Sequence, residues 1–225
     1  MKKHMSIGFI CLLIMTFTAL PGVARAAAES INGTDTILRS YDWYLNQYDT
    51  GEDARINCGP ACAVMAAKWY DADFKGTVRQ ARDSIPDLAG KWWFYRDIRS
   101  YLAQNGIDIK YSFSFTITDA IKTLDEGKIM VVNIHSRDIS YRNDETAIGR
   151  FYTGEFGHFI ILKGYRQADG KGYFEVYDPY TMNSYDADGF PKGKDRLYPA
   201  DEVEASVCGW GDAEYIIINP PKQLK

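Results

Sequence analysis

The segment Asn57-Cys58-Gly59-Pro60 places a cysteine directly ahead of residues 61–70, which are rich in alanine and favour a helix. Proline is tolerated in the first turn of a helix, because its missing N–H leaves no bond unmade there. We therefore expect Cys58 at or just before a helix N-terminus, where the positive end of the helix dipole favours a thiolate. This placement suggests a nucleophile, whereas the alternative is a small buried side chain that opens a core helix.

The first residues have the pattern of a secretory signal. A basic start precedes the mostly apolar residues 7–20, and Ala24-Arg25-Ala26 has the small-x-small form of a cleavage site. No later run reaches the roughly 18 apolar residues that span a bilayer. We therefore expect a secreted protein, extracellular or periplasmic, without membrane insertion in its mature form. The predicted parts are a signal peptide over residues 1–26, a flexible leader over 27–39 and a single domain over 40–225.

The charge of the mature chain excludes one class of partner. Without the three basic residues of the signal, the 26 lysines and arginines fall to 23 against 30 acids, a net charge of about −7. Such a chain does not attract polyanions, and no cluster of basic residues offsets the balance. We expect no nucleic-acid partner, and we predict a monomer.

The cysteine count leaves several pairings open. The mature chain holds Cys58, Cys62 and Cys208, an odd number that suggests one free thiol and one disulfide in an exported protein. We favour a disulfide between Cys62 and Cys208, while three free thiols, or a Cys62 oxidised onto Cys58, are the alternatives. No second Cys or His pair has the spacing of zinc ligands, and we expect neither a metal nor a cofactor.

The pattern of apolar residues predicts helices first and strands afterwards. Amphipathic or alanine-rich segments alternate with usual helix stops in the first half, whereas short β-branched and aromatic runs dominate the second. This order predicts an α+β fold with a mostly antiparallel sheet, and an exposed loop over residues 186–199 that borders a substrate cleft. The predicted helices cover residues 59–70, 77–84, 94–104 and 118–126, and the predicted strands cover 129–134, 158–162, 172–177 and 215–218.

A cysteine nucleophile needs a base and a group that orients the base. Beyond the signal the sequence holds only His135 and His158, and His158 begins a predicted strand at the mouth of a loop. Asp178 ends a later strand. If the two strands are antiparallel neighbours, Asp178 accepts the Nδ1–H of His158 and leaves Nε2 facing Cys58.

Acyl transfer also needs donors aimed at the developing oxyanion. The backbone N–H of Cys58 is one candidate, and the side-chain amide of Gln47 is another. Asn46 and Asn57 carry the same amide chemistry, so the spacing does not decide among the three.

The order Gln47, Cys58-Gly59-Pro60, Gly157-His158 and Asp178-Pro179 resembles papain-like cysteine peptidases of the bacteriocin-processing, double-glycine-leader type, and especially their free-standing exported relatives. The resemblance implies a papain-like fold in which helices carrying the cysteine pack on a mostly antiparallel sheet carrying the histidine and aspartate. It also implies Cys58 as nucleophile, His158 as base, Asp178 as orienting group and Gln47 as oxyanion donor. Cleavage after a double glycine is not implied, because this chain lacks the transporter segment that leader-cleaving members precede.

These observations support a secreted cysteine peptidase or amide-bond hydrolase that acts on a peptide or protein. One alternative is a catalytically inactive binding module on a peptidase fold, favoured by aromatic runs such as residues 91–95. Another is an acyl transferase of the transglutaminase type, in which the order of Cys, His and Asp is the same.

Overall fold

The computed structural model describes residues 34–36, 39–142, 146–209 and 213–221. The predicted signal peptide, residues 1–26, and the first part of the predicted leader lie outside these residues. Three leader residues form strand β1. The helices are α1 (Cys58–Tyr70), α2 (Val78–Asp83), α3 (Tyr95–Gln104), α4 (Ile117–Asp125) and α5 (Ala200–Cys208); short 3-10 turns are η1 (Gln47–Asp49), η2 (Ala54–Ile56), η3 (Pro86–Leu88) and η4 (Ser136–Asp138). The strands are β1 (Thr34–Thr36), β2 (Ile109–Ser112), β3 (Ile129–His135), β4 (Gly157–Ala168), β5 (Lys171–Tyr177), β6 (Arg196–Pro199) and β7 (Tyr215–Ile218).

The strands of the described residues form one seven-stranded sheet with the order β2-β7-β3-β4-β5-β6. Every paired neighbour in it is antiparallel, as the order of helices first and strands afterwards predicts. Strand β1 pairs with residues 164–166 of β4, beyond residues 157–162, which pair with β3. The fold class is therefore α+β with an antiparallel sheet, as predicted.

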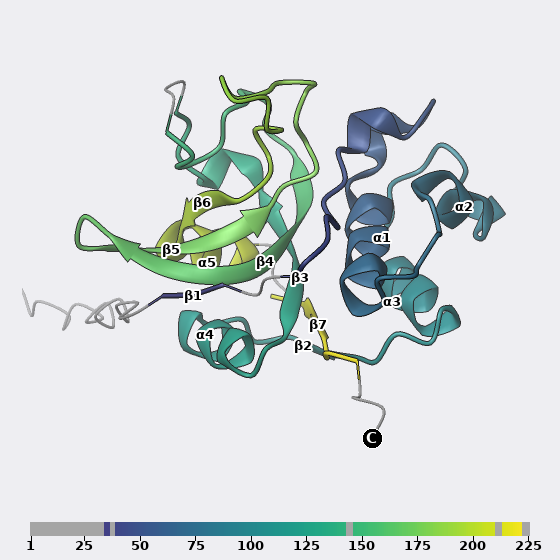
Figure 1. Ribbon diagram of the computed structural model, residues 1–225, viewed down its shortest axis with the longest axis horizontal. Helices are drawn as coiled ribbons and strands as arrows, with labels where there is room; N and C mark the ends of the chain where they lie inside the picture. The colour runs from purple at the N-terminus through teal and green to yellow at the C-terminus, as the bar shows by residue number, and fades with distance from the viewer. Residues whose placement is uncertain (1–33, 37–38, 143–145, 210–212, 222–225) are drawn as a thin grey trace, which may run out of the picture.

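The sheet separates two hydrophobic cores. Alternate residues of a strand point to opposite faces, so Ile129 and Val131 of β3 belong to the core shared with α1 and α3. Met130, Val132 and Ile134 belong instead to the core shared with α4 and α5. In Figure 1, α1, α2 and α3 gather on one side of the sheet, and α4 and α5 lie away from them. Both faces of the central strands are thus covered, which explains why β3 and β4 are almost continuously apolar.

Helix α1 is buried nearly all round because its side chains are small. Ala61, Ala63, Ala66 and Ala67 are fully buried, and such side chains let the neighbouring helices and the sheet approach the helix axis closely. Gly59 allows the same close approach in the first turn, since a Cβ there would lie 2.9 Å from the Cβ of Trp93. The helix that carries Cys58 is consequently held on several sides at once.

The predicted elements agree with the structure where the periodicity is strong. The observed bounds of α1 to α4, β3, β5 and β7 lie within a residue or so of those predicted, and β4 is longer than predicted. Thr77 begins α2 with a reciprocal capping box to Gln80. Strands β1 and β2 and helix α5 were not predicted, because they are short and follow no clear apolar pattern.

The prediction of an exposed loop over residues 186–199 is wrong at its end. Residues 196–199 form β6, and the Arg196 side chain is only 1% exposed. Arg196 is buried because its guanidinium donates to the carbonyl oxygens of Gly149, Thr146 and Ile148. A charged residue that finds several carbonyl partners is buried at low cost, and a sequence pattern does not reveal those partners.

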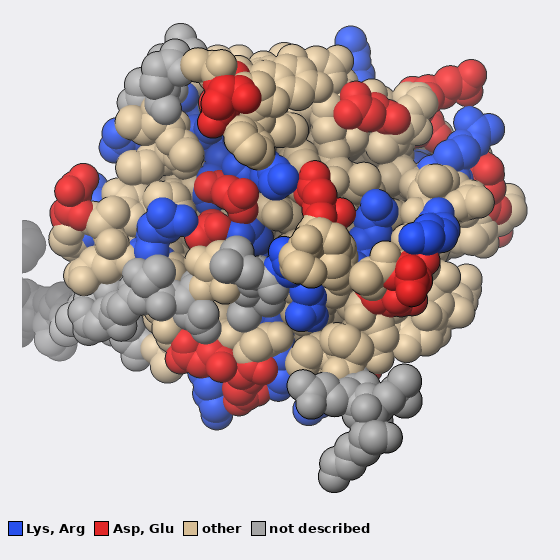
Figure 2. All heavy atoms as spheres, viewed as in Figure 1, with Lys and Arg blue, Asp and Glu red and all other residues tan. Residues whose placement is uncertain are grey.

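The surface seen in Figure 2 mixes acidic and basic side chains over its whole extent. That face has no broad field of one sign that would attract a charged polymer. Within the described residues, no helix is both long and apolar enough to cross a bilayer.

Candidate active site

Cys58 is the first residue of α1, and its side chain is almost fully buried. Asn57 precedes it as the helix N-cap, and the Asn57 carbonyl accepts the Ala61 N–H at 2.8 Å. The N–H of Cys58 has no partner within the helix, because the first N–H groups of a helix precede any acceptor. The predicted position at a helix N-terminus is thus confirmed, and it gives the thiol a neighbouring backbone donor.

His158 is the second residue of β4, opposite Ile134 of β3. Strands β4 and β5 are antiparallel neighbours, as predicted, so Asp178 lies just past β5 at the same end of the sheet. The His158 Nε2–H donates to Asp178 Oδ1 at 2.6 Å, and both side chains are buried. The side chain of Cys58 lies beside the His158 ring, where it helps to raise the pKa of His158. The structure therefore brings Cys58, His158 and Asp178 together.

The nitrogen assignment predicted for His158 is wrong. Asp178 takes Nε2, which leaves Nδ1 for Cys58, the reverse of the predicted arrangement. The register explains the difference: Ile161 pairs with Tyr177, so His158 lies opposite a position two residues past Asp178. At roughly 3.3 Å per residue, the carboxylate is too distant for the near nitrogen, and only the far nitrogen of the ring reaches it.

Opposing effects set the charge state of this pair. Burial alone would lower the pKa of His158, but the Asp178 charge, its hydrogen bond and Cys58 together raise that pKa to about 10. Burial would likewise raise the pKa of Asp178, but the charge and hydrogen bond of His158, with further donors, hold it below its usual value. At neutral pH the two residues form a buried imidazolium–carboxylate pair.

The Asp178 carboxylate accepts four hydrogen bonds. His158 and the backbone N–H of Tyr180 donate to Oδ1, the latter at 2.8 Å. The hydroxyls of Tyr152 and Tyr198 donate to Oδ2. Sequence analysis missed both tyrosines, because they lie 26 and 20 residues from Asp178 and no local pattern links them to it.

Gln47 lies in η1 next to the segment that follows Asp178. Its backbone N–H donates to the Pro179 carbonyl at 2.9 Å, and its buried amide nitrogen donates to the Ala54 carbonyl at 2.9 Å. A primary amide has two N–H groups, so one is left for another acceptor. Both N–H groups of Asn46 are used, by Asp49 and Asn183, which makes Gln47 the better oxyanion candidate of these two.

A buried arginine links the turn before Cys58 to the loop after η3. Arg82 of α2 donates from Nε to Asn57 Oδ1 at 2.6 Å and from Nη2 to the Ile56 carbonyl at 2.8 Å. Its Nη1 donates to the carbonyls of Leu88 and Lys91. Sequence analysis missed this residue, although it lies four positions after the buried Val78 and hence on the same helix face.

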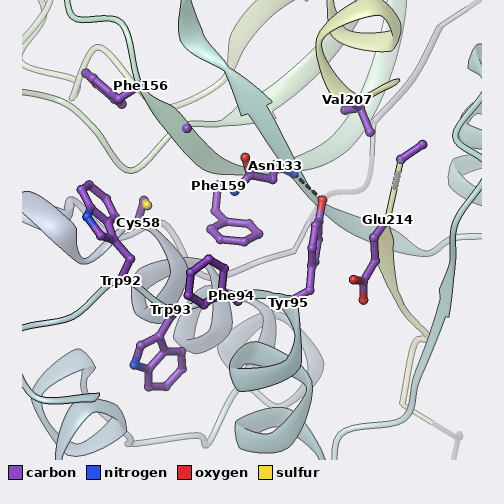
Figure 3. Close-up of a pocket in the computed structure, with 12 residues that line it drawn as sticks. Cys58, Trp92, Trp93, Phe94, Tyr95, Asn133, Phe156, Phe159, Val207 and Glu214 are labelled. Atoms are coloured by element: carbon purple, nitrogen blue, oxygen red, sulfur yellow. Dashed lines mark hydrogen bonds between the residues drawn. The ribbon is translucent and has the colours of Figure 1, made fainter. Parts of the chain in front are cut away.

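A cavity of about 500 Å³ opens beside Cys58 and is mostly apolar. Cys58, Trp92 and Phe156 lie toward one end of it, and Val207 and Glu214 lie toward the other (Figure 3). The aromatic side chains of its lining come from the segment that starts α3 and from residues around the start of β4. They are Trp92, Trp93, Phe94, Tyr95, Phe156 and Phe159.

The predicted disulfide between Cys62 and Cys208 is wrong, since all three described cysteines are free. Cys62 lies in the buried core of α1, whereas Cys208 ends α5 on the other side of the sheet and is exposed. Their elements pack on opposite faces, so the thiols cannot meet. Burial, with the nearby Cys58 and Asp178, raises the pKa of Cys62 well above its ordinary value, which keeps this second cysteine a thiol.

Comparison with known proteins agrees with this geometry. The model of the Peptidase_C39 like family matches residues 43–196, which include Gln47, Cys58, His158 and Asp178. The chain belongs to the Peptidase_C39 like family. No curated protein matches it.

Two solved structures share the fold of this C39-like chain. One is a protein of Bacillus anthracis described as a C39-like peptidase, with a TM-score of 0.50, 13% identity, and 84% of this chain and 98% of the other covered. The second is UfSP from C. elegans, with a TM-score of 0.52, 14% identity, and 85% of this chain but only 35% of UfSP covered. At such low identity these likenesses establish the fold alone, which is that of papain-like cysteine peptidases.

Proposed function

We propose that this C39-like chain is a secreted cysteine peptidase, or an amide-bond hydrolase on the same fold. Cys58 is the nucleophile, His158 the acid and base, and Asp178 the group that orients His158. The single observation that carries the proposal is the buried His158–Asp178 pair at 2.6 Å beside Cys58 at a helix N-terminus.

The charge state of the pair supports a thiolate–imidazolium mechanism. Because Asp178 raises the pKa of His158 to about 10, the ring is a cation at neutral pH and stabilises a thiolate beside it. The free backbone N–H groups at the start of α1 favour the same anion. An inactive binding module would not need a buried ion pair directed at a cysteine.

The reaction follows from these positions. Cys58 Sγ bonds to the substrate carbonyl carbon, and the oxyanion is held by the Cys58 N–H and the second N–H of Gln47. As the carbon–nitrogen bond breaks, the Nδ1 proton of His158 passes to the leaving amine. Water then attacks the acyl-enzyme, gives a proton to His158, and the carbon–sulfur bond breaks.

The substrate is a peptide or protein, and the cavity beside Cys58 is the part of the site that holds it. Its apolar lining and its volume of about 500 Å³ suit a large apolar side chain near the scissile bond.

Hydrolysis of a mixed peptide library by wild type, Cys58→Ala and Cys62→Ala tests the proposal. We expect Cys58→Ala to lose at least about 1,000-fold in rate, because the nucleophile is gone. Cys62→Ala, a matched substitution one helical turn away, should keep most of the activity. Equal turnover by wild type and Cys58→Ala would contradict the assignment.

A primary amine added to the same assay separates hydrolysis from acyl transfer. A peptidase releases mainly the free acid, whereas a transferase of the transglutaminase type releases the amide of the added amine. No contact in the described residues favours an amine acceptor over water.

Export is the second part of the proposal and rests on the signal pattern of residues 1–26. Expression of the full chain should give a shortened protein outside the cytoplasm, with a new N-terminus at Ala27. Retention of the full-length chain in the cytoplasm would contradict it.

A further inference from the structure

Two tyrosine hydroxyls converge on one oxygen of Asp178. Tyr152 donates to Oδ2 at 3.0 Å, and Tyr198 donates to the same atom. The two tyrosines come from different parts of the fold, the segment before β4 and the strand β6. Both are almost completely buried, so water does not replace either hydroxyl.

The surrounding structure fixes both rings. Tyr198 lies opposite Phe174 in the pairing of β5 with β6. The ring of Tyr152 stacks on Phe156 at 5.7 Å between centroids, and the Tyr152 carbonyl accepts from Arg150 at 2.6 Å. The hydroxyls are therefore held in place before any substrate binds.

Both hydroxyls act as donors over the whole working range of pH. Burial raises the pKa of Tyr152 and of Tyr198 well above the ordinary value, and the charge of Asp178 adds to this effect. Each hydroxyl therefore stays protonated and donates a hydrogen bond to the Asp178 carboxylate. A buried carboxylate with donors on both oxygens is stabilised as an anion.

We propose that Tyr152 and Tyr198 are positioning residues that hold the Asp178 carboxylate as an anion against His158, and so set the pH range in which His158 is a cation beside Cys58. The catalytic consequence rests on the proposed peptidase function, but the effect on His158 does not. Neither tyrosine lines the cavity, so the two residues act through Asp178 and not on the substrate.

The titratable groups around the pair come from several elements. They are Cys58 and Cys62 of α1, Tyr44 before η1, Tyr152 before β4, Tyr180 after β5 and Tyr198 of β6. Of these, Cys58 is the one that lies beside the ring and helps to raise the pKa of His158.

The experiment follows the His158 ring by NMR in a Cys58→Ala background, which removes the effect of the thiol on the ring and needs no substrate. We expect Tyr198→Phe to raise the titration midpoint of His158 by up to about one pH unit, because the carboxylate that loses a hydroxyl donor attracts its remaining donor, the imidazolium, more strongly. Tyr152→Phe should shift it in the same direction by less, and the double variant should shift it most.

Tyr165→Phe is the matched control. It also removes a hydroxyl that donates to an aspartate, Asp125, at 2.6 Å, but at the far part of β4. It should leave the midpoint unchanged. With Cys58 restored, the alkaline limb of the kcat/KM profile should move to higher pH in Tyr198→Phe, while KM changes little.

An unchanged His158 midpoint in folded Tyr198→Phe and Tyr152→Phe would overturn the inference. If Tyr198→Phe does not fold, the Tyr152→Phe variant alone decides, since its hydroxyl lies on the same oxygen. Failure of the wild type to hydrolyse any peptide would count against the proposed function and would leave the titration result valid.

Discussion

Asp178 is the residue on which the site depends most, and even its backbone is tightly packed. Its N–H donates to the Gly193 carbonyl at 2.8 Å, and its own carbonyl accepts from Tyr44 at 2.7 Å. A Cβ on Gly193 would lie 1.9 Å from the Asp178 carbonyl oxygen and 2.6 Å from the Tyr44 hydroxyl. Position 193 therefore requires glycine for space and not for its backbone freedom.

Gly193→Ala should displace Asp178 from His158. We expect a loss of activity of at least about tenfold and a decrease of about 1–3 kcal/mol in the free energy of unfolding, as for overpacked cores. Peptide hydrolysis and urea unfolding measure the two effects.

Gly209→Ala is the control for this substitution. Gly209 ends α5 with a helical backbone, and a Cβ there comes no closer than 3.2 Å to a neighbouring atom. Gly209→Ala should change neither the rate of peptide hydrolysis nor the free energy of unfolding by much. An active Gly193→Ala with unchanged stability would contradict the packing argument.

At the scale of elements, the short helix α2 organises two loops of the site. Arg82 holds the turn that contains Asn57, directly before Cys58, and the carbonyl of Lys91, directly before Trp92 of the cavity. Asn57 in turn donates to Thr50, whose hydroxyl donates to the Gln47 carbonyl. One polar network thus connects the turn before Cys58, the proposed nucleophile, with Gln47 and a wall of the cavity.

Arg82→Ala should destabilise the protein by about 3 kcal/mol, because several buried carbonyl and amide oxygens lose their donor. Arg79→Ala on the same helix removes only an exposed pair with Asp83 and should cost at most about 0.5 kcal/mol. Urea unfolding of the two variants gives the comparison. Equal effects would show that the network is not structural.

At the scale of the whole molecule, the sheet separates the two cores, and the site lies where its central strands β4 and β5 end. The helical part supplies Cys58 and the sheet supplies His158 and Asp178, so the site exists only when both parts pack together. The imidazolium–carboxylate pair then couples the stability of the fold to pH.

The sign of that coupling follows from the two shifts. Folding lowers the pKa of Asp178 from 3.8, so its contribution is present above that pH and is lost as the pH falls. Folding raises the pKa of His158 from 6.5 to about 10, so its contribution is complete below pH 6.5 and is lost as the pH rises toward 10. The pair therefore stabilises the folded state most between pH 3.8 and pH 6.5, the ordinary pKa values of the two groups.

Unfolding of wild type and of the double variant Asp178→Asn, His158→Gln measures this contribution. We expect the stability difference between the two to be larger at a pH of about 5 than at about 9, since each pKa unit is worth about 1.4 kcal/mol. The double variant serves as the control, because titration of the rest of the chain cancels in the difference. A difference independent of pH would contradict the coupling.

Several parts of the fold were predictable because they depend on local chemistry. Pro60 in a first turn and the alanines that follow fix the start of α1, and runs of β-branched and aromatic residues fix β3, β5 and β7. Strand β6 and the burial of Arg82 and Arg196 were not predictable, since a charged side chain is buried only where distant carbonyls receive it. The two tyrosines on Asp178 were missed for the same reason.

The sequence by itself determined the α+β class, the helix N-terminus that carries Cys58, and the residues Cys58, His158 and Asp178 as the candidate group. Only the tertiary structure decided which nitrogen of His158 faces Asp178, which donors hold that carboxylate, and that Cys62 and Cys208 lie apart. The physical reason is range: helix starts and strand periods depend on neighbours along the chain, whereas register, burial and hydrogen bonds across the sheet depend on residues brought together by folding.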